Sequence, residues 1–228
     1  MIPAIIYFLL RHYKRTNPAK AERLTLVMRK ATRMLLLFIL LTLICYYALP
    51  QDTQLQYSIK RKGSEVGIIS FSQQNSGNKT VLKIESKIRA RFLFLFTAIG
   101  QEESVFENDV MIWSSVYQKL NGDERVNKKT KLMGRNYIVT KGTESETIGS
   151  YPISYNMICL YAREPVNIPK VYSDAFQRFL DIQTLGDHYY KIAFPDGNYN
   201  EYHYSNGLCT NVEVHHWLYR SSFELKNK

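Results

Sequence analysis

After residue 53, apolar and polar residues alternate in short runs that turn residues separate. The first run, "QLQYSIKRKGSEVGIISFS", holds Lys62-Gly63 between two alternating segments. Such a pair between alternating runs is typical of a β-hairpin. The turn predicts three cross-strand pairs: Tyr57 with Ile68, Ile59 with Val66, and Lys60 with Glu65. We therefore expect one apolar face and one face of ion pairs, which together select a single register.

Further turn residues divide the rest of the chain into segments rich in Val, Ile, Tyr, Phe and Thr, as β-strands are. The turns are expected at 75–78, Asn108-Asp109, Asn121-Gly122, Met133-Gly134, Gly142, Asp196-Gly197 and Asn206-Gly207. Residues 152–162 and 173–180 are the helix candidates. The pattern predicts an all-β fold with one or two short helices, in which an antiparallel meander forms a curved sheet, a half-barrel or a lipocalin-like barrel.

The stretch "RARFLFLFTA", residues 89–98, is apolar on both faces if it forms one strand. Phe92, Phe94 and Phe96 would then share one face, because side chains alternate along a strand. Three interpretations are open: a strand buried on both faces, a wall that lines a ligand cavity, and an apolar patch that faces a partner or lipid.

A second aromatic face is expected in "VMIWSSVYQKL", residues 110–120. Met111, Trp113 and Tyr117 would lie on one face together with Ser115. Aromatic rings with interspersed hydroxyls fit a binding pocket, and they equally fit plain packing with polar edges satisfied. The candidate ligand-binding residues are Phe92, Phe94, Phe96, Trp113 and Tyr117.

The N-terminal part differs in character. A basic segment precedes an apolar run that extends from Met34 to about residue 49. A positive segment followed by such a run indicates a secretory signal, and the run is shorter than the roughly 20 residues that a membrane-spanning helix needs. We expect an N-terminal extension with a signal at 1–50 and an exported β-rich domain at 51–228. An uncleaved anchor at 34–49 and a lipoprotein at Cys45 are the alternatives.

Net charge does not point to nucleic acid. The formal charge is +10, but residues 1–50 carry eight Lys or Arg residues against one Glu, whereas residues 51–228 carry 22 against 19 Asp or Glu residues. The domain is therefore only mildly basic, and a nucleic-acid partner is not expected. If the signal is uncleaved, membrane contact is expected through residues 34–49 alone.

No catalytic motif is present. The chain lacks the G-x-S-x-G elbow, H-E-x-x-H, the P-loop, the dinucleotide glycine pattern and C-x-x-C. Glu102-Glu103 lies near an expected strand end, where solvated charge is usual. One cluster is conceivable, since His203, His216 and Glu201 share a face if the hairpin turns at Asn206-Gly207. We nevertheless expect no enzyme, no metal and no cofactor.

Cys159 and Cys209 remain in the expected exported domain, where oxidation is permitted. Two interpretations are open. The cysteines form a disulfide, or they are separately buried thiols that behave as small apolar side chains.

The chain from about residue 54 to 226 resembles a known family. The similarity is carried by "YSIKRKGSEVGIISFS", "EESVFENDV", "YQKLNGDERVNKKTKL", "YPISYNMICLYAREPVNIPKVYSDAFQRFL" and "FPDGNYNEYHYSNGLCTNVEVHHWLYRSSFEL". These segments resemble a family of small exported bacterial proteins catalogued only as a domain of unknown function. The opening and late hairpins are also similar to periplasmic domains of unknown function with lipocalin-like curved sheets. The resemblance implies an exported β-rich domain and no catalytic residues.

Two main function hypotheses follow. The first is a non-catalytic protein of the periplasm or cell envelope that holds a lipid or another apolar or amphipathic ligand inside the sheet. The second is an envelope interaction or structural module with a packed interior and a protein partner. A third hypothesis, an enzyme of unrecognised type, would centre on His203, His216 and Glu201.

Overall fold

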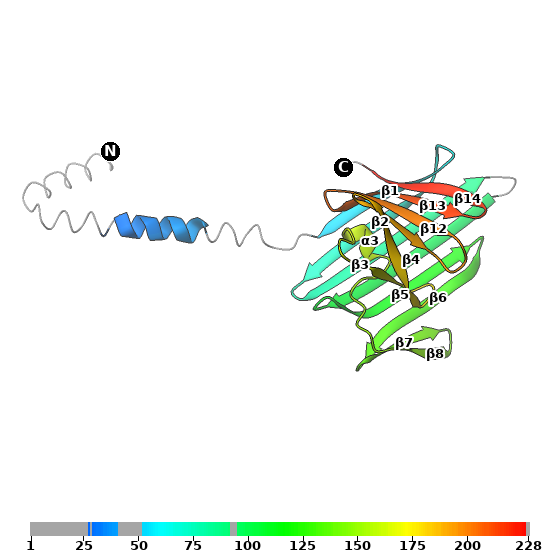
Figure 1. The fold of residues 1–228 in the computed structure, drawn as a ribbon, viewed down its shortest axis with the longest axis horizontal. Helices are drawn as coiled ribbons and strands as arrows, with labels where there is room; N and C mark the ends of the chain where they lie inside the picture. The colour runs from blue at the N-terminus through cyan, green and yellow to red at the C-terminus, as the bar shows by residue number, and fades with distance from the viewer. Residues whose placement is uncertain (1–26, 28, 41–51, 92–94, 227–228) are drawn as a thin grey trace, which may run out of the picture. The chain divides into compact units, whose positions relative to one another are not determined.

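The computed structural model describes residues 27, 29–40, 52–91 and 95–226 (Figure 1). The chain divides into two compact units, residues 1–50 and 51–228. In the first unit, residues 29–40 are helical, and this helix includes the start of the apolar run at Met34. Within the described residues, no helix combines the length and the apolar character that crossing a membrane requires. The remainder of the run lies outside the described residues.

The second unit consists of strands and the short helix α3. In chain order its elements are β1 (Thr53–Arg61), β2 (Ser64–Ser76), β3 (Lys79–Arg91), β4 (Leu95–Glu107), β5 (Val110–Leu120), β6 (Asp123–Met133), β7 (Asn136–Lys141), β8 (Glu144–Gly149), α3 (Cys159–Ala162), β9 (Lys170–Ser173), β10 (Arg178–Gly186), β11 (Tyr189–Ala193), β12 (Tyr199–Ser205), β13 (Leu208–His216) and β14 (Tyr219–Leu225).

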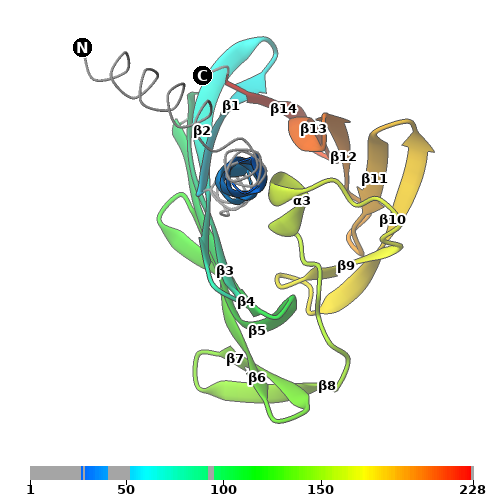
Figure 2. The same cartoon turned by 90° about the vertical axis from the view of Figure 1, so that its left-hand side faces the viewer.

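All these strands belong to one 14-stranded sheet, in the order β8-β7-β6-β5-β4-β3-β2-β1-β14-β13-β12-β11-β10-β9. Neighbouring strands are antiparallel, and the sheet is unclosed, with β8 and β9 at its edges. The sheet curves so that two parts of it, which we call its arms, face each other. One arm consists of β1 to β8 and the other of β9 to β14, and α3 lies between them (Figure 2). The predicted fold class, an antiparallel meander in a curved sheet with a short helix, is confirmed.

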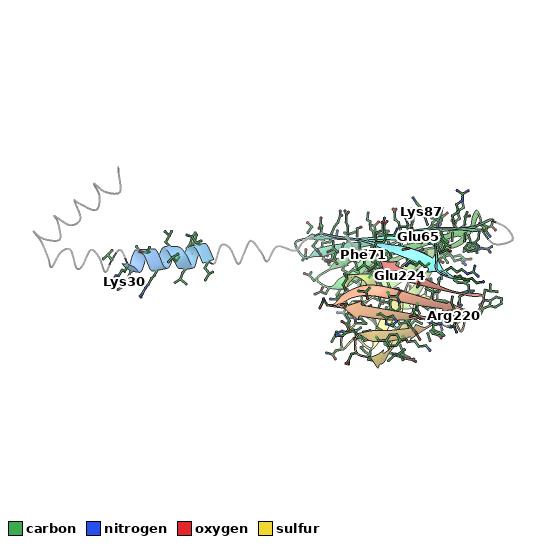
Figure 3. The ribbon with its side chains drawn as sticks, turned by 90° about the horizontal axis from the view of Figure 1, so that it is seen from above. Lys30, Glu65, Phe71, Lys87, Arg220 and Glu224 are labelled. Carbon is green, nitrogen blue, oxygen red and sulfur yellow. The ribbon has the colours of Figure 1, made fainter. Side chains whose placement is uncertain are left out.

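The pairing of β1 with β14 joins the two arms. Ile59 lies opposite Phe223 in this pair. On the other face of the strands Lys60 forms an ion pair with Glu224, and Lys226 pairs with Glu65 at 3.0 Å. The carboxylates of Glu65 and Glu224 lie on either side of β1 (Figure 3). Apolar contact inside and ion pairs outside therefore specify the same register.

Alternate residues of the strands form the core on the face that packs against α3, which we call the inner face. Neighbouring strands place buried side chains beside one another, as in the pair Phe71 and Ile84. The largest fully buried side chains are Tyr57, Tyr137, Tyr172, Tyr202, Phe71, Ile59, Met111, Ile153, Ile158, Leu160, Ile192 and Val116. Each large apolar side chain buried in this way stabilises the fold by about 1.5–3 kcal/mol.

Several buried tyrosines use their hydroxyl groups to satisfy main-chain carbonyls. Tyr57 donates to the carbonyl of Cys209 at 2.9 Å, and Tyr204 donates to that of Leu160 at 2.9 Å. Tyr137 donates to the carbonyl of Met111 at 2.8 Å. The rings supply apolar area while the hydroxyls complete hydrogen bonds that burial would otherwise leave unmade. The sequence contains 17 tyrosines, and these contacts explain why the core tolerates so many.

Helix α3 covers the inner face but is shorter than the predicted helix over 152–162. The backbone of Ile153 instead bonds to Met111 and to the Tyr137 hydroxyl. The next residues then run beside β9, where Asn156 forms a parallel bridge with Tyr172. These tertiary bonds hold the first half of the segment extended, so helix forms only after it.

The predicted helix over 173–180 is wrong. The chain turns at 174–177 between β9 and β10, and Phe179 pairs with Tyr172 across the hairpin. Gln177 has a φ of 56°, which a right-handed helix does not accommodate. Ser173 is therefore the last residue of a strand.

The first hairpin forms at Lys62-Gly63 as predicted, with φ values of 49° and 79° that suit a two-residue turn. Lys60 lies opposite Glu65 as expected, but Ile59 lies opposite Gly67, because a bulge follows the turn. The bulge also places Tyr57 opposite Ile69 rather than Ile68. A Cβ atom at Gly67 would lie 2.4 Å from the carbonyl oxygen of Lys87, so only glycine fits here.

The apolar stretch 89–98 is a hairpin and not one strand. β3 ends at Arg91 and β4 begins at Leu95, and Ala90 pairs with Phe96. No Gly, Pro, Asn or Asp marks the reversal, so the usual turn signals do not reveal it. Phe92 and Phe94 lie outside the described residues.

Replacing Leu160 by Ala tests whether α3 seals the core. Leu160 is fully buried, at 0% exposure, so we expect the free energy of unfolding to fall by about 2–5 kcal/mol. Urea denaturation followed by far-UV circular dichroism measures the change. Leu185→Ala is the control, since Leu185 is 46% exposed and its loss should cost less than about 0.5 kcal/mol. Equal effects of the two variants would contradict the role given to α3.

Candidate functional site

A cavity of about 550 Å³ opens on the inner face of the sheet. Its walls come from both arms, since β3, β4 and β5 supply one side and β13 and β14 the other. Most of the side chains that line it are apolar, among them Ile84, Ile88, Leu120, Val214 and Phe223. The volume is within the range of about 300–1,000 Å³ that small-molecule sites occupy.

A second space of about 290 Å³ adjoins the cavity. The two spaces share part of their lining, including Ile59, Glu102 and Phe223. The inner space is closed by Tyr161 of α3 and by the turn between β9 and β10, which contains Asp174. A ligand that enters from outside would therefore meet an apolar wall first and polar groups deeper.

Small residues in the middle of long strands leave this space open. Along β3 the inner face reads Leu82, Ile84, Ser86, Ile88 and Ala90, and along β4 it includes Ala98 and Gly100. A Cβ atom at Gly100 would lie 2.5 Å from the hydroxyl oxygen of Ser86, so a side chain there would displace this hydroxyl. The alternation of the strand aims these positions inward, and their small volume leaves room that a packed core would fill.

Glu102 lies on the wall that the two spaces share. Burial, together with the smaller effect of the nearby charge of Asp174, raises the pKa of its carboxyl group to about 7. A carboxyl group with a pKa near 7 changes its charge in the physiological pH range. The sequence pattern suggested solvated charge here, and this prediction is wrong for Glu102, because the alternation along β4 turns it inward and Glu103 outward. The sequence signal for this orientation is that Glu102 lies two residues after Gly100 and four after Ala98, on the same face of β4.

Asp174 is held in a closed hydrogen-bond network. It accepts bonds from Ser114 and from the side-chain amide of Asn156, the latter at 2.9 Å. The same amide also donates to the hydroxyl of Ser104 at 2.7 Å. Burial raises the pKa of Asp174, and the bonds from Ser114 and Asn156 oppose the rise. The network fixes the turn between β9 and β10 against β4 and β5.

One end of the cavity lies where the hairpins β1-β2, β5-β6 and β13-β14 turn. Three basic residues, Arg61, Lys119 and Arg125, line this end. The turn between β13 and β14 adds Leu218, which is 62% exposed, and Tyr219, and next to them Trp217 is 79% exposed. This end of the cavity therefore combines positive charge with exposed apolar and aromatic side chains.

The structure places only part of the predicted ligand-binding set on the cavity. Phe96 lines it, whereas Trp113 and Tyr117 are not part of the lining found among the described residues. A bulge at Ile112 shifts β5 by one residue, so that Met111 faces inward with Ser114 and not with Trp113. Phe92 and Phe94 lie outside the described residues. Ala90, which precedes them in the sequence, and Phe96, which follows them, both line the cavity.

Cys159 and Cys209 are buried free thiols. Each sulfur has its own local partner, the side chain of Asn156 at 3.3 Å for Cys159 and the carbonyl of Asn211 at 3.8 Å for Cys209. Burial raises the pKa of both thiols to about 12. The structure thus holds the two separate thiols of the second interpretation, and neither is activated as a nucleophile.

The predicted grouping of His203, His216 and Glu201 is wrong in one member. Because of a bulge near His203, this residue pairs with Asn211. As a result His215, and not His216, lies on the same face of the sheet as His203 and Glu201. The two-residue turn at Asn206-Gly207 is present as expected, but the extra residue on β13 reverses the alternation beyond it.

Residues 57–226 match the family described as "Domain of unknown function (DUF6134)". The chain belongs to this family. The match to DUF6134 extends from within β1 to the residue after β14, so it covers the sheet except for residues 53–56, and all the residues that line the cavity. The resemblance to a family catalogued only as a domain of unknown function is confirmed.

The DUF6134 domain is also similar to a solved structure described as "Crystal Structure of Beta-barrel-like Protein of Domain of Unknown Function DUF1849 from Brucella abortus". The two share 11% sequence identity with a TM-score of 0.49, over 76% of this chain and 95% of that chain. Comparison with curated proteins finds no match.

Replacing Glu102 by Gln tests the raised pKa. Because its pKa rises from 4.5 to about 7 on folding, the folded state keeps a proton that the unfolded state releases in that window. The free energy of unfolding should therefore fall as the pH rises from about 5 to about 8, by roughly 1–3 kcal/mol more in the wild type than in Glu102→Gln. Denaturant titrations across this pH range measure the difference.

Glu103→Gln is the matched control, because Glu103 is the next residue on β4 and pairs with Lys83 on the outer face at 3.2 Å. It should leave the pH slope of the wild type in place. Parallel pH profiles for the wild type and Glu102→Gln would show that Glu102 titrates as a solvated carboxylate.

Proposed function

We propose that the DUF6134 domain is a non-catalytic envelope protein that binds an amphipathic ligand in the cavity between its two arms. The observation that carries the proposal is a cavity of about 550 Å³ lined mostly by apolar side chains, beside a second space of about 290 Å³ that shares part of its lining. An interaction module with a packed interior would fill this space, whereas a binding protein needs it.

The charges around the cavity favour a ligand with an anionic head and an apolar chain. Arg61, Lys119 and Arg125 give positive charge to one end of the cavity lining, and the exposed Trp217 and Leu218 offer apolar contact beside it. Deeper inside, the raised pKa of Glu102 lowers its negative charge near neutral pH. The chain of the ligand would then lie against Ile84, Ile88 and their neighbours, with its head at the basic end.

The interior supports binding rather than catalysis. The side chain of Asp174 is engaged by Ser114 and Asn156, and both thiols have pKa values raised to about 12. A nucleophile needs an accessible, activated group beside a base. Asp174 and the two thiols are each engaged by neighbouring groups, which suits a structural polar network.

Export is part of the proposal. Arg29, Lys30 and Arg33 precede the apolar run that begins at Met34, which is the order of a secretory signal. The periplasm or another part of the envelope would bring the domain close to amphipathic molecules. An uncleaved segment would keep it attached there through residues 34–49.

Native mass spectrometry of the full chain, expressed in a bacterial host and recovered from its envelope fraction, tests ligand and export together. We expect an extra mass that organic extraction removes and that identifies as an anionic amphiphile. The protein mass itself shows whether the N-terminal segment has been cut. A bare mass before and after extraction, in repeated preparations, would reject the ligand and favour the packed interaction module.

Replacing Ala98 by Trp should block the cavity. The larger side chain would occupy the space between Ile88 and Leu120, and we expect ligand occupancy to fall about tenfold, which corresponds to ~1.4 kcal/mol of binding free energy. Native mass spectrometry and thermal denaturation are recorded together. The melting temperature should change little, because the added ring fills an existing space.

Gln101→Trp is the control, since Gln101 is exposed on the outer face of the same strand. It should leave ligand occupancy unchanged. If Ala98→Trp instead loses about 1–3 kcal/mol of stability, as overpacked cores do, the space is too small to hold a ligand.

A further inference from the structure

A second cluster of functional side chains lies on the outer face of β12 and β13, on the opposite side of the sheet from the core. Glu201, Glu213 and His215 each offer one ligand atom, and these atoms lie within 4.8 Å of one another. Tyr202 and Val212, their neighbours in sequence, are buried in the core. The alternation of the two strands therefore places the cluster on the face that the ligand cavity does not use.

The two carboxylates of the cluster are directly opposed. Glu201 pairs with Glu213 in the register of β12 and β13, and the side chain of Glu201 is only 14% exposed. Like charges in directly opposite positions destabilise a sheet, and partial burial reduces the screening by water. A positive charge between the two carboxylates would convert this repulsion into attraction.

The distances in the cluster have the size of the edges of a metal coordination shell. His215 Nε2 lies 3.6 Å from an oxygen of Glu201 and 3.6 Å from an oxygen of Glu213. These separations exceed those of good hydrogen bonds. Zinc with bonds of about 2.0–2.2 Å to nitrogen and oxygen separates its tetrahedral ligands by about 3.4 Å. His203 Nε2 lies 3.4 Å from the other oxygen of Glu213 and flanks the same group.

The imidazole atoms of the cluster are buried without hydrogen-bond partners. Among the described residues, none makes a hydrogen bond to His215 Nδ1, His215 Nε2 or His203 Nε2, although water does not reach these atoms. Buried polar side-chain atoms are usually paired. A bound ion between the carboxylates would satisfy His215 Nε2, which is the atom that faces both of them.

The surrounding side chains hold the ligands in place. Tyr199 stacks on His215, and Tyr189 stacks on His203, each with ring centroids 4.3 Å apart. The hydroxyl of Tyr189 donates to the Glu201 carboxylate at 2.6 Å. Such outer contacts orient metal ligands and are typical of built metal sites.

We propose that Glu201, Glu213 and His215 bind a divalent transition-metal ion, with zinc as the reference ion. One imidazole and two carboxylates form a ligand set that zinc accepts, and a fourth position is left for water or for His203. The ion ties β12 to β13 on the outer face and neutralises the opposed carboxylates. The site is independent of the ligand cavity and would persist if the cavity bound nothing.

The test is a zinc titration of the untagged full chain after treatment with a strong chelator, in competition with a chromophoric chelator. We expect one zinc ion to bind per chain and to raise the melting temperature. His215→Ala should weaken binding at least about tenfold, because the cluster loses its nitrogen ligand. His216→Ala is the matched control, since the adjacent His216 lies on the other face of β13 and should leave zinc affinity unchanged.

Glu213→Gln provides a second variant of nearly unchanged shape, and circular dichroism confirms that each variant folds. It should also weaken zinc binding at least about tenfold. The proposal is overturned if the wild type shows no saturable binding, or if His215→Ala and Glu213→Gln bind zinc as tightly as the wild type. An equal loss in His216→Ala would likewise overturn it, because binding would then follow histidine content and not this cluster.

Discussion

The antiparallel pairing of β1 with β14 joins two meanders, β1 to β8 and β9 to β14, into one sheet. β1 to β8 and β9 to β14 are each built from neighbouring hairpins, and among the described strands this is the one pair that connects the two arms. Ile59 and Phe223 meet across it on the inner face, where both also line the cavity. The arms can therefore enclose α3 and the cavity because one long-range pair sets their relative register.

The enclosed space results from a balance along the strands. Large residues such as Phe71 and Tyr57 fill the part of the inner face that α3 covers, while Ser86, Ala98 and Gly100 leave the neighbouring part open. One sheet thus provides a packed core and a cavity side by side. Glu102 and the network around Asp174 mark the boundary between them, where polar groups meet apolar walls.

The sequence supports a good prediction of the fold and a poorer prediction of the site, and the bulges explain the difference. Turn residues at Lys62-Gly63 and Asn206-Gly207 correctly locate two hairpins. Each bulge, however, adds one residue to one strand and reverses which side chains face inward beyond it. The bulge near His203 brings His215, and not His216, to the face that carries Glu201. The bulge at Ile112 places Met111 and Trp113 on opposite faces of β5. The sequence contains no local mark of either. The hairpin formed by β3 and β4 was not predicted for a related reason, since no turn residue marks the sequence between the two strands.

The unclosed sheet has a consequence for how the molecule avoids self-association. An edge strand presents unpaired main-chain groups that can recruit another chain. At one edge, β9 is covered by the segment before α3, since Tyr172 exchanges main-chain hydrogen bonds with Tyr155 at 2.9 Å and with Met157 at 3.0 Å. At the other edge, β8 is short and carries the exposed acidic residues Glu144 and Glu146. The protein's own chain thus pairs with one edge strand, and charged side chains disfavour pairing of another chain with the other edge strand. Both features disfavour edge-to-edge association of an open sheet that does not close into a barrel.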